Sequence, residues 1–300
     1  MDYDEFKEEM VKELKERHSG EADMELQTVV KANGVCYDGV GILPKGMDAV
    51  GTAVPVFRLD RPYKAYDSGG LGIRECADAI WEEYVSGRKA GDMQKFLKDI
   101  RGWGYARDNV YPMLLPLGKN RGLLEDLVSF PVLDLVVVFI IRGEADTAGY
   151  CCTKFRKEML GYYDTSREEL HRAAMDNMGK DGYRFRDIKE LMDSSLVHED
   201  TTGGIPECAR MRVLSNRGNI YGAAGILDRE LVREFAGGRD MYILPSSLHE
   251  VIFVPAEGNE KAELDEMVRG INELEVAEEE RLADHCYFYD AKKDEIRMKP

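Results

Sequence analysis

Apolar residues recur at helical spacing in several stretches of the chain. In residues 3–17, Phe6, Met10 and Leu14 follow one another at intervals of four, so they share one face of a predicted amphipathic helix. In residues 165–178, overlapping Thr-x-x-Glu and Ser-x-x-Glu capping patterns precede a similar apolar stripe. Helices are likewise predicted over residues 71–85, 92–100, 123–128 and 227–236, and a long acidic helix around 264–271.

Runs of β-branched and aromatic residues predict strands between these helices. Asn33-Gly34 separates two such runs and predicts a hairpin, because both positions of its turn favour positive φ. Residues 132–141 form an almost continuous apolar run, which predicts a buried central strand with 150–155 as its hairpin partner. Further strands are predicted over residues 53–59, 111–117, 241–244 and 250–254.

The second half of the chain adds two predicted hairpins. One joins residues 210–215 to residues 219–223 around Arg217-Gly218. The other joins residues 285–289 to residues 295–298 near the end of the chain.

The order of these elements predicts the fold class. Strands come in hairpins, and helices are interspersed without strict βαβ alternation, which favours an α+β fold with antiparallel, hairpin-built sheets. A length of 300 residues fits two α+β lobes, residues 1–162 and 163–300, or one large domain.

Charge and cysteine content narrow the class of protein. The chain has 41 Lys and Arg against 57 Asp and Glu, a net charge of −16, which argues against general nucleic-acid binding and against docking on anionic membranes. The longest apolar run, residues 135–141, is far shorter than the roughly 20 residues of a membrane-spanning helix. The chain starts with acidic residues, unlike a secretory signal, and its six cysteines include no C-x-x-C pair. We therefore expect a cytoplasmic protein with reduced thiols.

Each standard catalytic pattern fails at a definite position. Gly41 and Gly46 have the glycine spacing of a phosphate-binding loop, but Met47 and Asp48 follow where lysine and a hydroxyl residue belong. In the dinucleotide-binding pattern that starts at residue 70, Glu75 replaces the third glycine. No H-E-x-x-H or G-x-S-x-G motif occurs. We therefore predict no metal and no cofactor.

Residues 246–250 combine hydroxyl, imidazole and carboxylate groups directly after a predicted strand. Because loops at strand ends commonly carry sites, we predict a binding surface made of these polar side chains and others nearby: Tyr242, Ser246, Ser247, His249, Glu250 and His285. The structural alternative is a loop after Pro245 whose hydroxyls cap backbone groups. The catalytic alternative is a hydrolase that uses His249 or His285 as its general base, since imidazole titrates near neutrality.

Four segments of the chain resemble one bacterial protein family. They are MRVLSN at 211–216, MYILPSSLHEVI at 241–252, DHCYFYD at 284–290, and residues 120–135. In their order and in total length they are similar to the family catalogued as domain of unknown function number fifty-six eighty-eight. The chain has Pro131-Val132 before Leu133-Asp134-Leu135, where the family pattern has a Pro-His pair. The resemblance implies kinship over most of the chain and carries no activity.

The sequence thus favours a cytoplasmic, non-enzymatic protein that binds a protein partner or a small molecule in a regulatory role. Besides the hydrolase, a third class is an acidic decoy that mimics nucleic acid, with its negative charges in phosphate-like rows. The glutamates of residues 273–280 form either a solvated helix face or a docking surface for a basic partner.

Overall fold

The computed structural model confirms the α+β fold class and describes residues 1–46, 54–89, 92–143, 151–188 and 211–298, with backbone alone for 87–89 and 92–94. The chain divides into two compact units. Unit 1 comprises residues 1–109, 141–153 and 158–165, and unit 2 comprises residues 110–140, 154–157 and 166–300. Segments of the two units alternate along the chain.

Unit 1 begins with a helix and a three-stranded sheet in the order β1-β2-β3. The bounds are α1 Tyr3–His18, β1 Ala22–Val30, β2 Cys36–Pro44 and β3 Val56–Arg58. The predicted hairpin is confirmed: β1 and β2 pair antiparallel, and Asn33 and Gly34 have φ of 60° and 76° in their connection. Asn and Gly tolerate this left-handed region, which explains why this dipeptide forms the turn.

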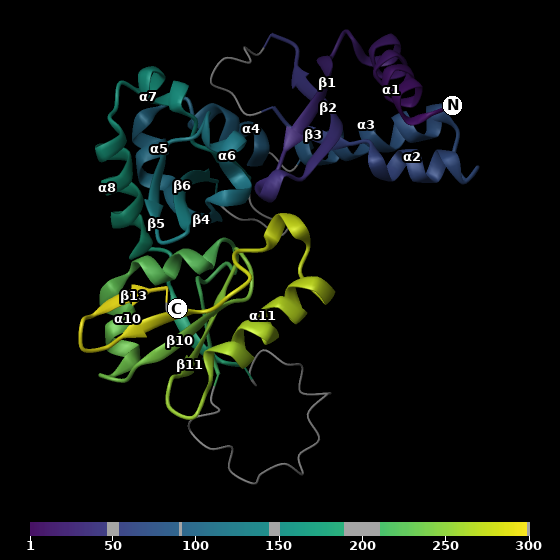
Figure 1. Ribbon diagram of the computed structural model, residues 1–300. Coiled ribbons are helices and arrows are strands. Elements are labelled where there is room, and N and C mark those ends of the chain that lie inside the picture. Colours follow the sequence, from purple (N-terminus) through teal and green to yellow (C-terminus); the bar gives the residue numbers. More distant parts are fainter. Residues whose placement is uncertain (47–53, 90–91, 144–150, 189–210, 299–300) are drawn as a thin grey trace. The chain divides into compact units, whose positions relative to one another are not determined.

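The core of unit 1 lies between the sheet and two helices (Figure 1). Phe6, Met10 and Leu14 of α1 are fully buried, as their spacing predicted, and they pack with Met24 of β1 and with Tyr84 of α3, Ile73–Lys89. The remaining helices of the unit are α2 Asp60–Asp67, α4 Asp92–Asp99, α5 Trp103–Asn109 and α7 Lys157–Tyr163. Of these, the sequence pattern did not predict α2, α5 and α7, which are eight residues or shorter.

A four-stranded sheet runs in the order β4-β6-β5, with β7 also paired to β6. Its strands and the nearby helices are β4 Val110–Pro116, α6 Arg121–Leu124, β5 Ser129–Val132, β6 Leu135–Arg142, β7 Cys152–Lys154 and α8 Arg167–Met178. The prediction of a buried central strand over residues 132–141 is confirmed from Leu135 onward, because β6 is buried throughout and lies between β4 and β5. The segment predicted as its hairpin partner contains β7, which pairs with β6. The predicted start of the strand is three residues too early. Val132 pairs with Leu135 across a turn in which Leu133 has a φ of 55°, so the apolar run holds the end of β5 and all of β6 up to Ile141. Because β5 and β6 are both apolar next to this turn, composition alone does not show where the first strand ends and the second begins.

Two other predicted elements are shorter than expected. The helix predicted over residues 123–128 is α6, which ends at Leu124. The strand predicted over residues 53–59 is β3, which has three residues.

Unit 2 also holds a six-stranded sheet in the order β13-β12-β10-β11-β9-β8. The bounds are β8 Arg184–Asp187, β9 Arg212–Ser215, α10 Arg229–Ala236, β10 Met241–Pro245, β11 Val251–Pro255, α11 Lys261–Leu274, β12 Tyr287–Asp290 and β13 Glu295–Arg297. The final hairpin is confirmed, because β12 pairs antiparallel with β13. The helix α10 ends where predicted, with Gly237 in the left-handed region at its C-terminus.

The prediction of a strand over residues 219–223 is wrong. Asn219 and Tyr221 have φ of 51° and 55°, so the backbone leaves the extended region directly after β9. The Asn216 side chain holds this turn, because its amide donates to the Ile220 carbonyl (2.7 Å) and its oxygen accepts from the Ile220 N–H (3.0 Å). The chain continues into the 3₁₀ helix η4, Gly222–Leu227, and β9 pairs with β8 and β11 instead.

Helices cover both faces of the six-stranded sheet. Tyr242 and Phe288 point to the face where α11 packs with Leu264 and Val268. On the opposite face, the ring of Phe253 lies against two stacked rings from β8 and α10. This second face carries the cavity described below.

In the described part of the chain, no helix combines the length and apolar character needed to cross a bilayer.

Burial predicts how the thiols react. In the described residues no cysteine is in a disulfide; Cys36 and Cys152 are exposed, Cys76 and Cys286 are buried, and Cys208 lies outside the described residues. Burial, together with the Asp265 carboxylate, raises the pKa of Cys286 to about 12. We expect iodoacetamide at about pH 8 to alkylate Cys36 and Cys152 in the native protein, and Cys76 and Cys286 only after denaturation. Peptide mass spectrometry measures this, and native-state labelling of Cys286 equal to that of Cys36 would contradict the described packing.

Candidate functional site

The loop between β10 and β11 brings four of the predicted binding residues together. The Ser246 hydroxyl donates to Glu250 Oε1 (3.3 Å), and the His249 N–H donates to Ser247 Oγ (3.0 Å). The Leu248 N–H donates to the Glu280 carbonyl (2.8 Å), which ties the loop to the short helix η5, Glu278–Glu280. The structural expectation that a hydroxyl in this loop caps backbone is therefore confirmed for Ser247.

The surroundings of His249 fix its hydrogen-bonding role. The Tyr221 N–H donates to His249 Nδ1 (3.1 Å), and the two rings stack with centroids 5.3 Å apart. Since Nδ1 uses its lone pair as an acceptor, the neutral ring carries its proton on Nε2, as we infer from this network. His249 Nε2 lies 3.6 Å from Glu280 Oε1, so the nitrogen that faces this carboxylate is a donor. This tautomer does not suit the role of a general base at Nε2.

The structure places the other two predicted residues elsewhere. Tyr242 is 4% exposed in the core beneath α11, with its ring 5.4 Å from that of Phe288. His285 Nε2 lies 3.5 Å from Asp134 Oδ2, and the Tyr287 hydroxyl donates to Asp134 Oδ1 (2.8 Å). Burial, and then the Asp134 carboxylate, raises the pKa of Tyr287, so this phenol stays protonated. The six predicted residues therefore occupy three separate surroundings.

A cavity of about 250 Å³ opens at the β13 edge of the six-stranded sheet, and we call it the β13 pocket. Seven of its lining residues are aliphatic: Val132, Leu133, Leu135, Ile226, Leu227, Val232 and Ile296. They come from the β5–β6 turn, from η4 and α10, and from β13. Three segments far apart in the sequence, residues 132–135, 226–232 and β13, thus make one apolar wall, which no local pattern could reveal.

The polar part of the β13 pocket centres on Asp294. The Tyr289 hydroxyl donates to Asp294 Oδ1 (2.7 Å), Arg233 Nη1 lies 3.3 Å from Asp294 Oδ2, and Arg229 donates to the Asp294 carbonyl. The hydrogen bond from Tyr289 outweighs the effect of burial and holds the pKa of Asp294 below its ordinary value. Burial and the Asp294 carboxylate raise the pKa of Tyr289 to about 12. Both groups therefore keep fixed protonation states at neutral pH.

A strained backbone position borders the β13 pocket. Leu133 has a φ of 55° and is 36% exposed, and its side chain lines the cavity. A left-handed conformation costs an L-residue with a Cβ roughly 1–2 kcal/mol, and turns of this kind favour Gly or Asn. Such strain is commonly found at binding sites. Here it presents an aliphatic side chain at the pocket wall.

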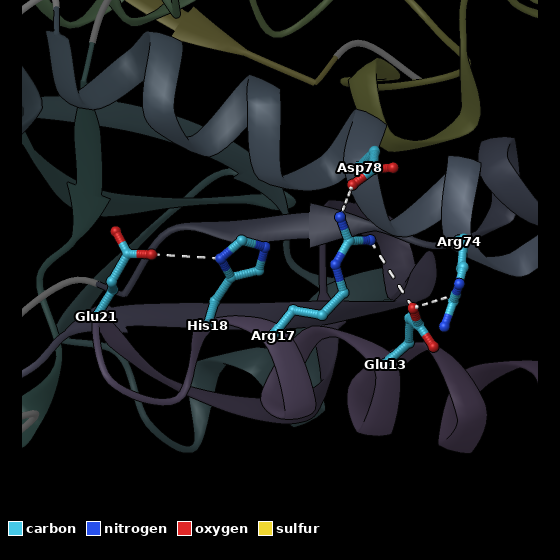
Figure 2. Close-up of polar contacts among 6 residues, drawn as sticks. All are labelled: Glu13, Arg17, His18, Glu21, Arg74 and Asp78. Carbon is cyan, nitrogen blue, oxygen red and sulfur yellow. Dashed lines mark hydrogen bonds and ion pairs between the residues drawn. The ribbon is translucent and has the colours of Figure 1, made fainter.

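Polar side chains also gather on unit 1, where Figure 2 shows Glu13, Arg17, His18, Glu21, Arg74 and Asp78. Arg17 donates to Asp78 of α3, and Glu13 Oε1 lies 3.2 Å from Arg74 Nε and 3.8 Å from Arg17 Nη1. Ion pairs of this exposed kind contribute about 0–1 kcal/mol each. We interpret these ion pairs as a structural link between α1 and α3.

Among the described residues, no group of three or more His, Cys, Asp or Glu side chains is arranged to hold a metal ion.

Together, the fold and these sites define an α+β protein with an apolar pocket at a sheet edge. The chain belongs to the family described as "Family of unknown function (DUF5688)", which matches residues 3–291 and confirms the resemblance noted in the sequence. No curated protein and no solved structure matches the chain.

Proposed function

We propose that the chain is a non-enzymatic binding protein that takes a small, mainly apolar molecule into the β13 pocket. The observation that carries this proposal is the cavity of about 250 Å³ with its aliphatic wall. A cavity of about 150 Å³ holds one benzene molecule, so this one accommodates a ligand of roughly ten non-hydrogen atoms. In the part of the chain that the structure describes, no disulfide is formed, which supports a reducing compartment, and we propose the cytoplasm.

The chemistry of the wall favours binding over catalysis. Among the described residues that line the β13 pocket, none is histidine, cysteine, serine or lysine, and the groups that could act as acids or bases are those of Tyr289, Asp294 and Glu295. The Tyr289–Asp294 pair keeps its protonation state at neutral pH, as its pKa shifts indicate. This pair therefore supplies polar atoms of fixed protonation state, with which a polar group of an otherwise apolar ligand can form a hydrogen bond.

Ligand-observed NMR tests the proposal. We expect saturation-transfer signals from at least one of three probes of about ten non-hydrogen atoms: indole, 1-naphthol and octan-1-ol. Ile296→Trp replaces an aliphatic side chain with an indole ring that fills part of the cavity. It is therefore expected to weaken probe binding by about tenfold or more. Leu274→Trp is the matched control, because Leu274 lies on α11 and is 81% exposed. It is expected to bind like the wild type.

Two results would overturn the proposal. One is the absence of signal from all three probes at concentrations up to their solubility. The other is equal binding by Ile296→Trp and Leu274→Trp when both variants show native circular dichroism.

A hydrolase that uses His285 is the second candidate function. The observation in its favour is the 3.5 Å approach of His285 Nε2 to Asp134, since a carboxylate commonly orients a catalytic imidazole. A screen of esterase, phosphatase and nuclease substrates, with and without divalent metals, discriminates it from binding. Activity that His285→Ala abolishes and Ile296→Trp leaves intact would establish the hydrolase and count against the binding protein.

Five of the six residues predicted from the sequence remain candidates for contact with a partner, whereas Tyr242 is buried in the core beneath α11. Among them, His249 and Glu250 are half-buried in the β10–β11 loop. A binding role predicts that alanine at both positions abolishes capture of a partner without unfolding the protein. If the chain were instead an acidic decoy with its negative charges in phosphate-like rows, it would compete with DNA for a DNA-binding protein. A competition assay tests this alternative.

A further inference from the structure

We infer that the outer side of α11 is a docking surface for a basic amphipathic helix of a partner protein. Met267, Ile271 and Leu274 of α11 are 41%, 42% and 81% exposed. Their spacing of four and three residues places them in one line along the helix, next to the buried side that Leu264 and Val268 form. We call this line the α11 ridge.

The α11 ridge is more apolar than a solvated surface helix requires. A helix that covers a sheet needs one apolar stripe, and Leu264 and Val268 already supply it, at 4% exposure each. The α11 ridge extends the apolar surface of the helix toward solvent. It is about 10 Å long, because Met267 and Leu274 are seven residues apart and each residue advances a helix by about 1.5 Å. Partner helices bind such surfaces through apolar anchors at the same spacing.

Charge decides which kind of partner fits. Exposed glutamates border the α11 ridge: Glu263 precedes it by one turn, and Glu266 and Glu273 lie along one flank. Acidic residues continue beyond its end, at Glu275 and in η5, whereas Arg269 lies on the opposite side of α11. An apolar line with acidic borders complements a helix that has an apolar stripe flanked by Lys or Arg.

The same charges count against a second copy of the chain as occupant. Two α11 ridges in contact would bring their glutamates together, and each chain carries a net charge of −16. Like charges across an interface disfavour association. The α11 ridge and the β13 pocket lie at opposite faces of the six-stranded sheet, so this inference is independent of the proposed ligand.

Fluorescence anisotropy with a synthetic peptide tests the inference on the full chain. The probe is a labelled peptide of about 18 residues, long enough to form a helix, with leucines on one side and lysines on the other. We expect it to bind, and to bind about tenfold more weakly to the double variant Ile271→Ala and Leu274→Ala, which removes the anchors while keeping good helix formers. A peptide of the same composition in scrambled order is expected to bind about tenfold more weakly to the wild type.

Charge variants separate docking from general attraction. The pair Glu266→Gln and Glu273→Gln is expected to weaken binding and to reduce its dependence on salt between about 50 and 300 mM NaCl. The matched control is Glu230→Gln with Glu234→Gln, two exposed positions on α10, and we expect it to bind like the wild type. Equal loss in both pairs would mean that only net charge matters, and it would overturn the inference.

Three further results would also overturn it. The first is no binding to the wild type, and the second is equal binding of the ordered and scrambled peptides. The third is a wild-type dimer in sedimentation velocity that the Ile271→Ala and Leu274→Ala variant converts to a monomer, because a second copy would then be the occupant.

Discussion

Gly222→Ala is expected to destabilise the protein by about 3 kcal/mol or more, because a side chain at this position meets atoms that cannot move aside. A Cβ on Gly222 would overlap Ser215 Oγ and would lie 2.6 Å from the His249 carbonyl oxygen and 2.7 Å from the Asn216 nitrogen. Two of these are backbone atoms, and the Ser215 hydroxyl also donates to the His249 carbonyl (2.8 Å). Urea unfolding followed by circular dichroism measures the change.

Gly270→Ala is the matched control and is expected to have the opposite sign. Gly270 lies inside α11, and a Cβ there meets nothing within 4 Å. Alanine in an open helical position stabilises by about 0.5–1 kcal/mol relative to glycine. If both variants changed stability by the same amount, the close approach of η4 to the β10–β11 loop would be contradicted.

Phe253→Ala is expected to cost about 3–5 kcal/mol, the range for removal of a fully buried ring. Phe253 is 0% exposed, with its ring centroid 5.0 Å from Phe185 and 5.7 Å from Phe235. These two rings stack on each other at 3.5 Å, so truncation of Phe253 leaves a cavity beside a pair that other contacts hold in place.

Two further substitutions calibrate this prediction by the same unfolding measurement. Phe253→Leu fills part of the space and is expected to cost clearly less than Phe253→Ala. Leu71→Ala, at a position 40% exposed, is expected to stay within about 0.5 kcal/mol of the wild type. A cost for Phe253→Ala as small as that for Leu71→Ala would contradict the described core.

Much of the fold could be predicted because its signals are local. The stripe of Phe6, Met10 and Leu14 and the turn at Asn33-Gly34 each express a preference of neighbouring residues. The failures lie at turns that residue type alone does not signal. Leu133 adopts a left-handed conformation that its residue type disfavours, and Asn216 folds residues 219–221 away from the predicted strand through its side chain.

The candidate site could be predicted only in part. Residues 246–250 are neighbours in sequence, so their common loop followed from the position of Pro245 at the end of a strand. The β13 pocket did not, because its wall joins Leu133, Leu227 and Ile296, which no periodicity relates. The Tyr289–Asp294 hydrogen bond in its wall crosses a hairpin turn, and the sequence gives no signal for its orientation toward a cavity.

A crystal structure of the chain soaked with the tightest-binding probe tests the central claim most directly. We predict electron density for the probe between Leu135, Val232 and Ile296, with its polar end toward Tyr289. Density for the probe elsewhere on the molecule, with only ordered water in the cavity, would contradict the account.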